Sequence, residues 1–243
     1  MANVFVEESS LVNIANAIRE KNGSTDTYKP NEMAQAITDI QSGGGNSELE
    51  VLYDSLMQAT TISFMRSQYD GDLVFALPNT LTSLYEKFRE CLKVKNITVI
   101  SENLITNCYR AFQYCSELIT ITLNADTSQC TNFNMPFHSC GKLVSINGKE
   151  LDFSSATNVT GCFTGCTALK DIRFAKNSLK LSIDIPCKSL STESLQSIAE
   201  GLATVTTAET ISFPKDIALS DDQKIIIKNK GWTLTIGGQE VVL

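Results

Sequence analysis

The sequence predicts an α+β fold whose middle is a solenoid, a stack of similar coils of chain. An apolar pattern occurs four times, starting at residues 88, 112, 137 and 163, which are 24, 25 and 26 residues apart. A helical pattern precedes these copies, and an alternation of helix and strand patterns follows them. One repeat unit can bury its apolar face only against its neighbours, so the copies are expected to stack.

Residues 1–41 predict a helical hairpin. Apolar residues recur at helical spacing in two short segments, with Gly23 placed to end the first helix and Pro30 to begin the second. Two such helices are too small to be stable alone, so we expect the hairpin to dock onto the rest of the chain or onto a partner. The residues expected to anchor this assembly are Leu11, Ile14, Ile18, Met33, Ile37 and Ile40.

Residues 42–47 contain three successive glycines and predict a flexible linker. Residues 48–80 then predict a short helix and strands that lead into the repeats. The Leu49, Leu52 and Leu56 spacing leaves two interpretations open: the helix seeds a dimer or trimer, or it covers the open end of the stack.

The repeat, over residues 81–180, reads Phe, Cys three residues later, an aliphatic residue three after that, and Ile three further on. An apolar residue follows the Ile by two in three of the four copies, as expected for a short strand with one buried face. The Phe-x-x-Cys part has near-helical spacing and predicts a tight helical turn. The expected core residues are Phe88, Cys91, Ile97, Phe112, Cys115, Leu118, Ile121, Phe137, Cys140, Leu143, Ile146, Phe163, Cys166, Leu169 and Ile172.

In residues 181–243 the Phe and Cys pattern ends. Ser191 is placed to begin a helix, and residues 211–213 predict a strand that stops at Pro214. Ser220 and Gln223 have the spacing of a capping box for a last helix, whose apolar portion is residues 225–227. Residues 232–236 predict a closing strand. The segment therefore predicts an α/β cap that shields the final coil from solvent.

Composition limits the partners. A net charge of −7 argues against a nucleic-acid or anionic-membrane partner, because both need clustered Lys and Arg. No apolar stretch reaches the 18 residues that a membrane-spanning helix needs. The N-terminal residues lack the basic head and apolar stretch of a secretory signal, so we expect the chain to fold in a cytoplasm.

The eight cysteines favour packing over chemistry. The sequence has no Cys-x-x-Cys pair and a single histidine, His138, so zinc-ligand spacing is missing. Four cysteines keep the repeat register and should be reduced core thiols, and the other four, Cys108, Cys130, Cys162 and Cys187, are expected only to pack.

Catalytic patterns are also missing. His138 is the single candidate base for a neighbouring Cys, the acidic residues form no recognisable pair, and there is no phosphate-binding Gly loop. We expect no enzyme, no cofactor and no metal site.

The Phe-x-x-Cys-x-x-Leu-x-x-Ile run over roughly residues 80–180 resembles the BspA-like branch of bacterial leucine-rich repeats. The resemblance implies a leucine-rich-repeat-like solenoid with strands on one side. One departure is the Asn that ends the strand in common leucine-rich repeats. Its positions here hold Glu102, Asp126, Leu151 and Asn177.

Residues 10–23 and 28–37, with their Ile-Ala-x-Ala-Ile-Arg and Pro-x-x-Met-Ala segments, resemble a module at the N-termini of virion proteins of phages that infect Gram-positive bacteria. The Gly-Trp start of the last strand is similar to the ends of phage-borne relatives of these repeats. These resemblances imply a virion structural protein of a tail, baseplate or head fibre, assembled in the host cytoplasm. Expected partners are other virion proteins, through the hairpin, copies of the same chain, most simply in a trimer, and a host surface receptor. The alternative is a bacterial BspA-like surface adhesin or protein-binding module.

Overall fold

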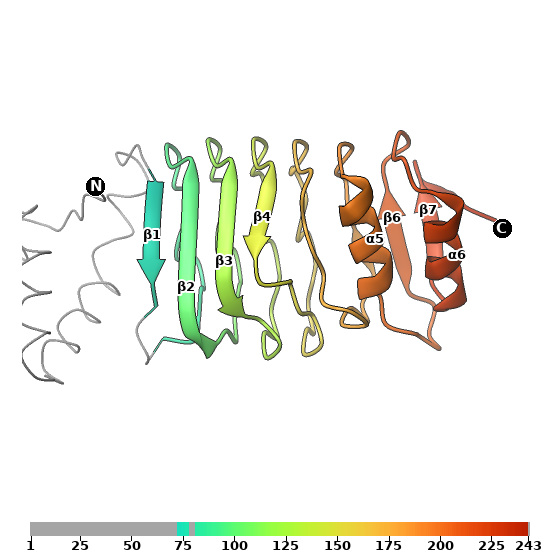
Figure 1. The fold of residues 1–243 in the computed structure, drawn as a ribbon, viewed down its shortest axis with the longest axis horizontal. Coiled ribbons are helices and arrows are strands. Elements are labelled where there is room, and N and C mark those ends of the chain that lie inside the picture. Colours follow the sequence, from blue (N-terminus) through green and yellow to red (C-terminus); the bar gives the residue numbers. More distant parts are fainter. Residues whose placement is uncertain (1–71, 78–80, 243) are drawn as a thin grey trace, which may run out of the picture. The chain divides into compact units, whose positions relative to one another are not determined.

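The chain divides into two compact units, Met1–Met65 and Arg66–Leu243. The computed structural model describes residues 72–77 and 81–242, all in the second unit (Figure 1). The predicted hairpin with its six anchor residues, the linker and most of residues 48–80 lie outside the described residues. No described helix is long and apolar enough to cross a membrane.

A parallel sheet forms one side of the repeats. Its strands, in spatial order, are β1 (Asp72–Ala76), β2 (Asn96–Leu104), β3 (Thr120–Asp126) and β4 (Ser145–Gly148). Leu73 pairs with Ile97, Ile97 with Ile121, and Ile121 with Ile146, so each coil contributes one strand in the same register. Figure 1 shows the strands side by side, with the returning segments of each coil behind them.

Beneath the sheet the repeat residues form columns. The rings of Phe88, Phe112, Phe137 and Phe163 stack with centroids 5.1, 5.7 and 5.7 Å apart. The Sγ atoms of Cys115, Cys140 and Cys166 each donate to the Phe carbonyl oxygen of the preceding coil, at 2.9, 3.0 and 3.0 Å. Every expected core residue is buried, and the most exposed of them, Ile146, is 4% exposed. This interior therefore holds the coils together and offers no group to solvent.

The predicted tight turn at Phe-x-x-Cys is confirmed, because each Cys N–H donates to the carbonyl oxygen of its Phe, but the prediction that it is helical is wrong. Each Phe lies in a run of hydrogen-bonded turns instead, and the residues two before and two after it have positive φ. The physical reason is where the N–H groups point. Glu86, Phe88 and Glu90 donate theirs to carbonyls of the next coil at 2.9, 2.8 and 2.7 Å, whereas a helix would use them within its own coil. The left-handed pairs are Glu86 and Glu90, Arg110 and Tyr114, Met135 and Ser139, and Gly161 and Gly165.

Stacking continues after the Phe and Cys pattern ends. The elements are β5 (Ile183–Asp184), α5 (Thr192–Gly201), β6 (Thr210–Phe213), α6 (Asp221–Asn229), β7 (Thr233–Ile236) and β8 (Gln239–Glu240). The strands form a second sheet in the order β5-β6-β7-β8, in which β8 runs antiparallel along the edge of β7.

Helices replace strands on one side of these last coils. In Figure 1, α5 and α6 lie on the side of β1–β4, and β6 and β7 lie behind them. The backbone N–H groups of Ile172 and Phe174 donate to Ser194 and Ser197 of α5, at 2.9 and 3.0 Å. The hydroxyl oxygens of these two helix residues thus accept hydrogen bonds from backbone N–H groups that have no further strand beside them to pair with.

The predicted helix starts are confirmed. Ser191 caps α5, and Ser220 and Gln223 form the capping box of α6. The predicted apolar portion of α6 is partly wrong, because Ile227 is fully buried while Ile225 is 45% exposed. Trp232 is buried before β7, and its Nε1 donates to the carbonyl oxygen of Ala203 at 2.8 Å.

Candidate functional site

The turn side of the coils carries a cluster of exposed aromatic residues. Every described Phe is buried, whereas the described tyrosines, Tyr85, Tyr109 and Tyr114, all lie in the turns of the first two coils. Tyr85 and Tyr114 are 52% and 41% exposed, and Tyr109 is half-buried. We call this surface the tyrosine face. It consists of two ring pairs, Tyr85 with Tyr109 and Tyr114 with His138, together with Arg110.

Ring contacts between coils fix the tyrosine face. Tyr85 and Tyr109, each three residues before a repeat Phe, stack with centroids 5.0 Å apart. The guanidinium carbon of Arg110 lies 4.7 Å from the Tyr109 ring centroid. Tyr114 meets His138 of the next coil edge to face, with centroids 5.6 Å apart.

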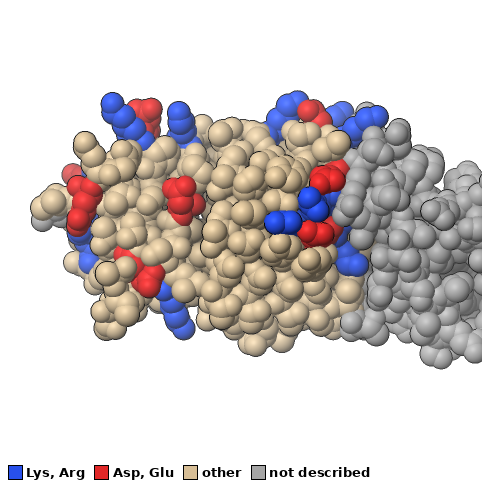
Figure 2. Space-filling model, turned by 180° about the vertical axis from the view of Figure 1, so that it is seen from behind, with Lys and Arg blue, Asp and Glu red and all other residues tan. Residues whose placement is uncertain are grey.

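Charges beside these rings are paired. Glu86 Oε1 lies 3.5 Å from Arg89 Nη1 and 3.6 Å from Arg110 Nη1, and Glu90 Oε1 lies 3.0 Å from Arg89 Nη2. Gln113 is 2% exposed, and its Oε1 has no hydrogen-bond partner. Figure 2 shows the turn side, where uncharged residues cover the middle and charged residues gather toward the ends.

The opposite side presents the outward residues of the first sheet. Asn96, Thr120 and Ser145 form one row across neighbouring strands, and Thr98, Thr122 and Asn147 form the next. Ser145 Oγ donates to Thr120 Oγ1 at 3.4 Å within the first row. This strand face offers hydroxyl and amide groups with no aromatic ring among those six residues.

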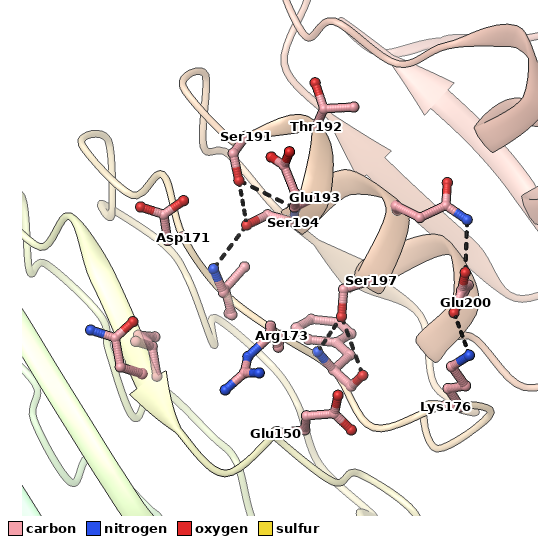
Figure 3. Close-up of a pocket in the computed structure, with 15 residues that line it drawn as sticks. Glu150, Asp171, Arg173, Lys176, Ser191, Thr192, Glu193, Ser194, Ser197 and Glu200 are labelled. Carbon is pink, nitrogen blue, oxygen red and sulfur yellow. Dashed lines mark hydrogen bonds and ion pairs between the residues drawn. The ribbon is translucent and has the colours of Figure 1, made fainter.

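A hollow of about 800 Å³ lies where β4 gives way to α5 (Figure 3). Arg173 extends along it and donates to the carbonyl oxygen of Gly148 at 2.6 Å. Lys176 pairs with Glu200 at 2.9 Å, and hydrogen bonds from Gln196 and Lys176 lower the pKa of Glu200. The carboxylates of Glu150, Asp171 and Glu193 also line the hollow. It is an open, mixed-charge depression on the surface.

Among the described residues, the imidazole of His138 is the base that contacts a hydroxyl group, because its Nδ1 lies 2.8 Å from Ser139 Oγ. The other ring contact of His138 is Tyr114, so no carboxylate orients the imidazole as a catalytic triad requires.

In residues 72–77 and 81–242 the thiols are buried, and no cluster of metal ligands is found. All eight cysteines are free and buried, and burial raises the pKa of Cys162 and Cys166 well above the ordinary range and that of Cys187 to about 12. The described part of the chain also holds no group of three or more His, Cys, Asp or Glu side chains that could bind a metal ion.

Sequence reasoning missed a polar ladder on the turn side. Asn107, Asn132 and Asn158 lie five residues before their Phe, and each Oδ1 accepts the backbone N–H two residues later at 2.9, 2.9 and 3.0 Å. Ser83 does the same in the first coil through Oγ, at 3.2 Å. Parallel bridges join these residues from coil to coil. The constant offset of Asn from the repeat Phe is the sequence signal for this ladder. The leucine-rich-repeat pattern instead predicts Asn at the ends of the strands.

A scan against protein-family models, a search of curated proteins and a search of solved structures each find no match for this chain.

Proposed function

We propose that this chain is a structural protein of a bacteriophage virion, in a tail, baseplate or head fibre. In this proposal residues 81–180 form a leucine-rich-repeat-like solenoid, and its outer surface serves host attachment. The observation that carries the proposal is the shared register of β1–β4, because it places outward side chains of successive coils in rows. Such rows make an extended surface suited to binding rather than to enclosing a reaction.

The proposed attachment to the particle is the hairpin of residues 1–41. Its sequence resemblance to virion modules supports this role. The proposed partners are other virion proteins, and copies of this chain in a trimer. The proposed place of action is the virion, with assembly in the host cytoplasm.

Deletion of residues 1–41 tests the proposal. The full chain should sediment with virions from a lysate of infected cells, and the shortened chain should remain in the supernatant. Thermal unfolding of the purified shortened chain should still be cooperative, which shows that the body folds. A matched control carries Thr122→Ala on the strand face and should sediment like the full chain. Recovery of the full chain on cells that contain no particles would contradict the proposal and favour the adhesin.

A further inference from the structure

The tyrosine face combines aromatic rings with hydrogen-bonding groups, and none of the residues that define it is aliphatic. Of the exposed large aliphatic residues of the described chain, Leu92 directly follows the turn of the first coil, and the others lie in or beside the strands, in α6 or at the C-terminal end. These exposed residues are Val74, Leu92, Ile100, Leu104, Ile119, Ile225 and Val242. Each tyrosine ring is an apolar surface with a hydroxyl group at its edge, so it can pack on a ligand and form a hydrogen bond with it. The composition fits a ligand that has small apolar patches between many hydroxyl groups.

The rings are held in place before any ligand binds. Tyr85 and Tyr109 stack on each other, and Arg110 lies against Tyr109. The backbone N–H of Tyr114 donates to the carbonyl oxygen of His138 at 2.9 Å, and that of Arg110 donates to Asn134 at 3.0 Å. Rings fixed in this way lose little conformational entropy on binding, which matters most for a small ligand.

The charges of this face indicate a neutral ligand. Arg110 shares Glu86 with Arg89, and Arg89 also pairs with Glu90, so each of these two carboxylates has a guanidinium partner. An anionic polymer would meet the carboxylates, and a cationic one would meet the guanidinium groups. A neutral ligand with hydroxyl groups can use both as hydrogen-bond partners.

We propose that the tyrosine face binds neutral hexose units of a polysaccharide. The C–H faces of separate sugar units pack on the exposed rings of Tyr85 and of Tyr114, and their hydroxyls bond to the phenol oxygens and to the Arg110 guanidinium. The buried Oε1 of Gln113 and Nε of Arg110 have no hydrogen-bond partner. The inference deepens the proposed function and rests on it for the source of the polysaccharide, a host cell surface.

The test uses the full chain and a printed set of neutral polysaccharides, namely glucan, galactan, mannan and rhamnan, with polyglycerol phosphate as an anionic polymer. We expect at least one neutral polymer to bind, and a Tyr85→Ala, Tyr114→Ala double variant to lose at least tenfold in affinity. The Tyr85→Phe, Tyr114→Phe variant should keep most of the affinity because it keeps both rings. Ile225→Ala removes an exposed apolar side chain in α6 and should bind like the unchanged protein. Thermal unfolding of each variant checks its fold.

Salt separates neutral from ionic binding. Raising ionic strength from about 0.05 to about 0.5 M should leave the affinity for the neutral polymer within twofold, since no net charge is neutralised. Binding to polyglycerol phosphate alone, binding to no polymer, or an affinity that the Tyr to Ala changes leave intact would overturn the inference. None of these outcomes depends on residues 1–41, so sedimentation with virions remains a separate test of the proposed function.

Discussion

Phe137 packs between Phe112 and Phe163, the equivalent residues of the two neighbouring coils, and the ring centroids are 5.7 Å apart on both sides. It is 2% exposed, and its carbonyl oxygen accepts the Cys166 thiol of the next coil. One side chain therefore supports two interfaces at once, and its loss should be felt by both neighbouring coils.

Phe137→Ala should lower the free energy of unfolding by about 3–5 kcal/mol, the range for a buried aromatic ring that leaves a cavity. Urea denaturation followed by circular dichroism measures the change. Ile225→Ala, at a 45% exposed site, should stay within about 0.5 kcal/mol of the unchanged protein. Similar losses in the two variants would show that the ring column does not support the coils.

Gly148 ends β4 where the preceding coils have Leu123 and Val99 in register. Its φ is +94°, and a Cβ there would lie 2.5 Å from the carbonyl oxygen of Leu123. Gly238 also has positive φ, of +79°, but a Cβ there would meet nothing within 4 Å. Comparing alanine substitutions at the two glycines therefore distinguishes the cost of a steric clash from the cost of a positive φ alone.

Gly148→Ala should cost more than about 2 kcal/mol of unfolding free energy, and Gly238→Ala about 1 kcal/mol. The difference arises because both alanines are strained by positive φ while Gly148→Ala must also displace a neighbouring strand. Thermal unfolding of the two variants measures it. Equal costs would remove the clash from the explanation.

At the scale of elements, each coil is held from two sides. Parallel strand pairing joins the coils on one side, and turn-to-turn hydrogen bonds join them on the other. The polar ladder of Asn107, Asn132 and Asn158 stabilises the turn side. Each Oδ1 accepts a hydrogen bond from a backbone N–H of the turn, which is not in a helix and so has no helical partner.

Asn132→Ala should lower the free energy of unfolding by about 1 kcal/mol, the net value of one hydrogen bond. Asn132→Ser should recover part of it, since Ser83 fills the same position in the first coil. Urea denaturation of both variants is the measurement. If serine destabilises as much as alanine, the hydrogen bond to the turn is not what the residue contributes.

The burial pattern shows how far element prediction could reach. Apolar spacing predicted the inward residues, and the capping residues Ser191 and Ser220 predicted where α5 and α6 begin. It did not predict the left-handed turns, since a three-residue spacing fits a helix and a pair of tight turns equally well. The tyrosine face was also missed. Tyr85 and Tyr109 share an offset from Phe, but exposure depends on which side of the coil that offset occupies.

At the scale of the whole molecule, thiols run through the interior of the stack. Burial raises the pKa of Cys115, Cys162, Cys166 and Cys187 in the folded chain, the last to about 12. In the unfolded chain the same thiols lose their protons near pH 8.5. Above that pH the unfolded state binds fewer protons than the folded state, so the free energy of unfolding must fall as pH rises.

The expected slope is a loss of about 1.4 kcal/mol per pH unit for each thiol that is charged when unfolded and protonated when folded. Urea denaturation at a series of pH values from about 8 to about 10.5 measures it, in the range between the unfolded value and the raised folded ones. Cys187→Ala should reduce the slope of the unfolding free energy against pH by the contribution of one thiol, even if the substitution also lowers stability at every pH. An unchanged slope would mean that this thiol ionises equally in both states.

In the repeats, the order of apolar residues was enough to predict which side chains lie inside and that successive copies meet, because one coil can bury its apolar side chains only against neighbouring coils. The tertiary structure decided the backbone conformation of the segments between those residues. The helix at α5 and the left-handed backbone around each Phe follow from the hydrogen-bond partners that the neighbouring coil supplies. Those partners lie about 25 residues away along the chain, beyond the reach of any local pattern.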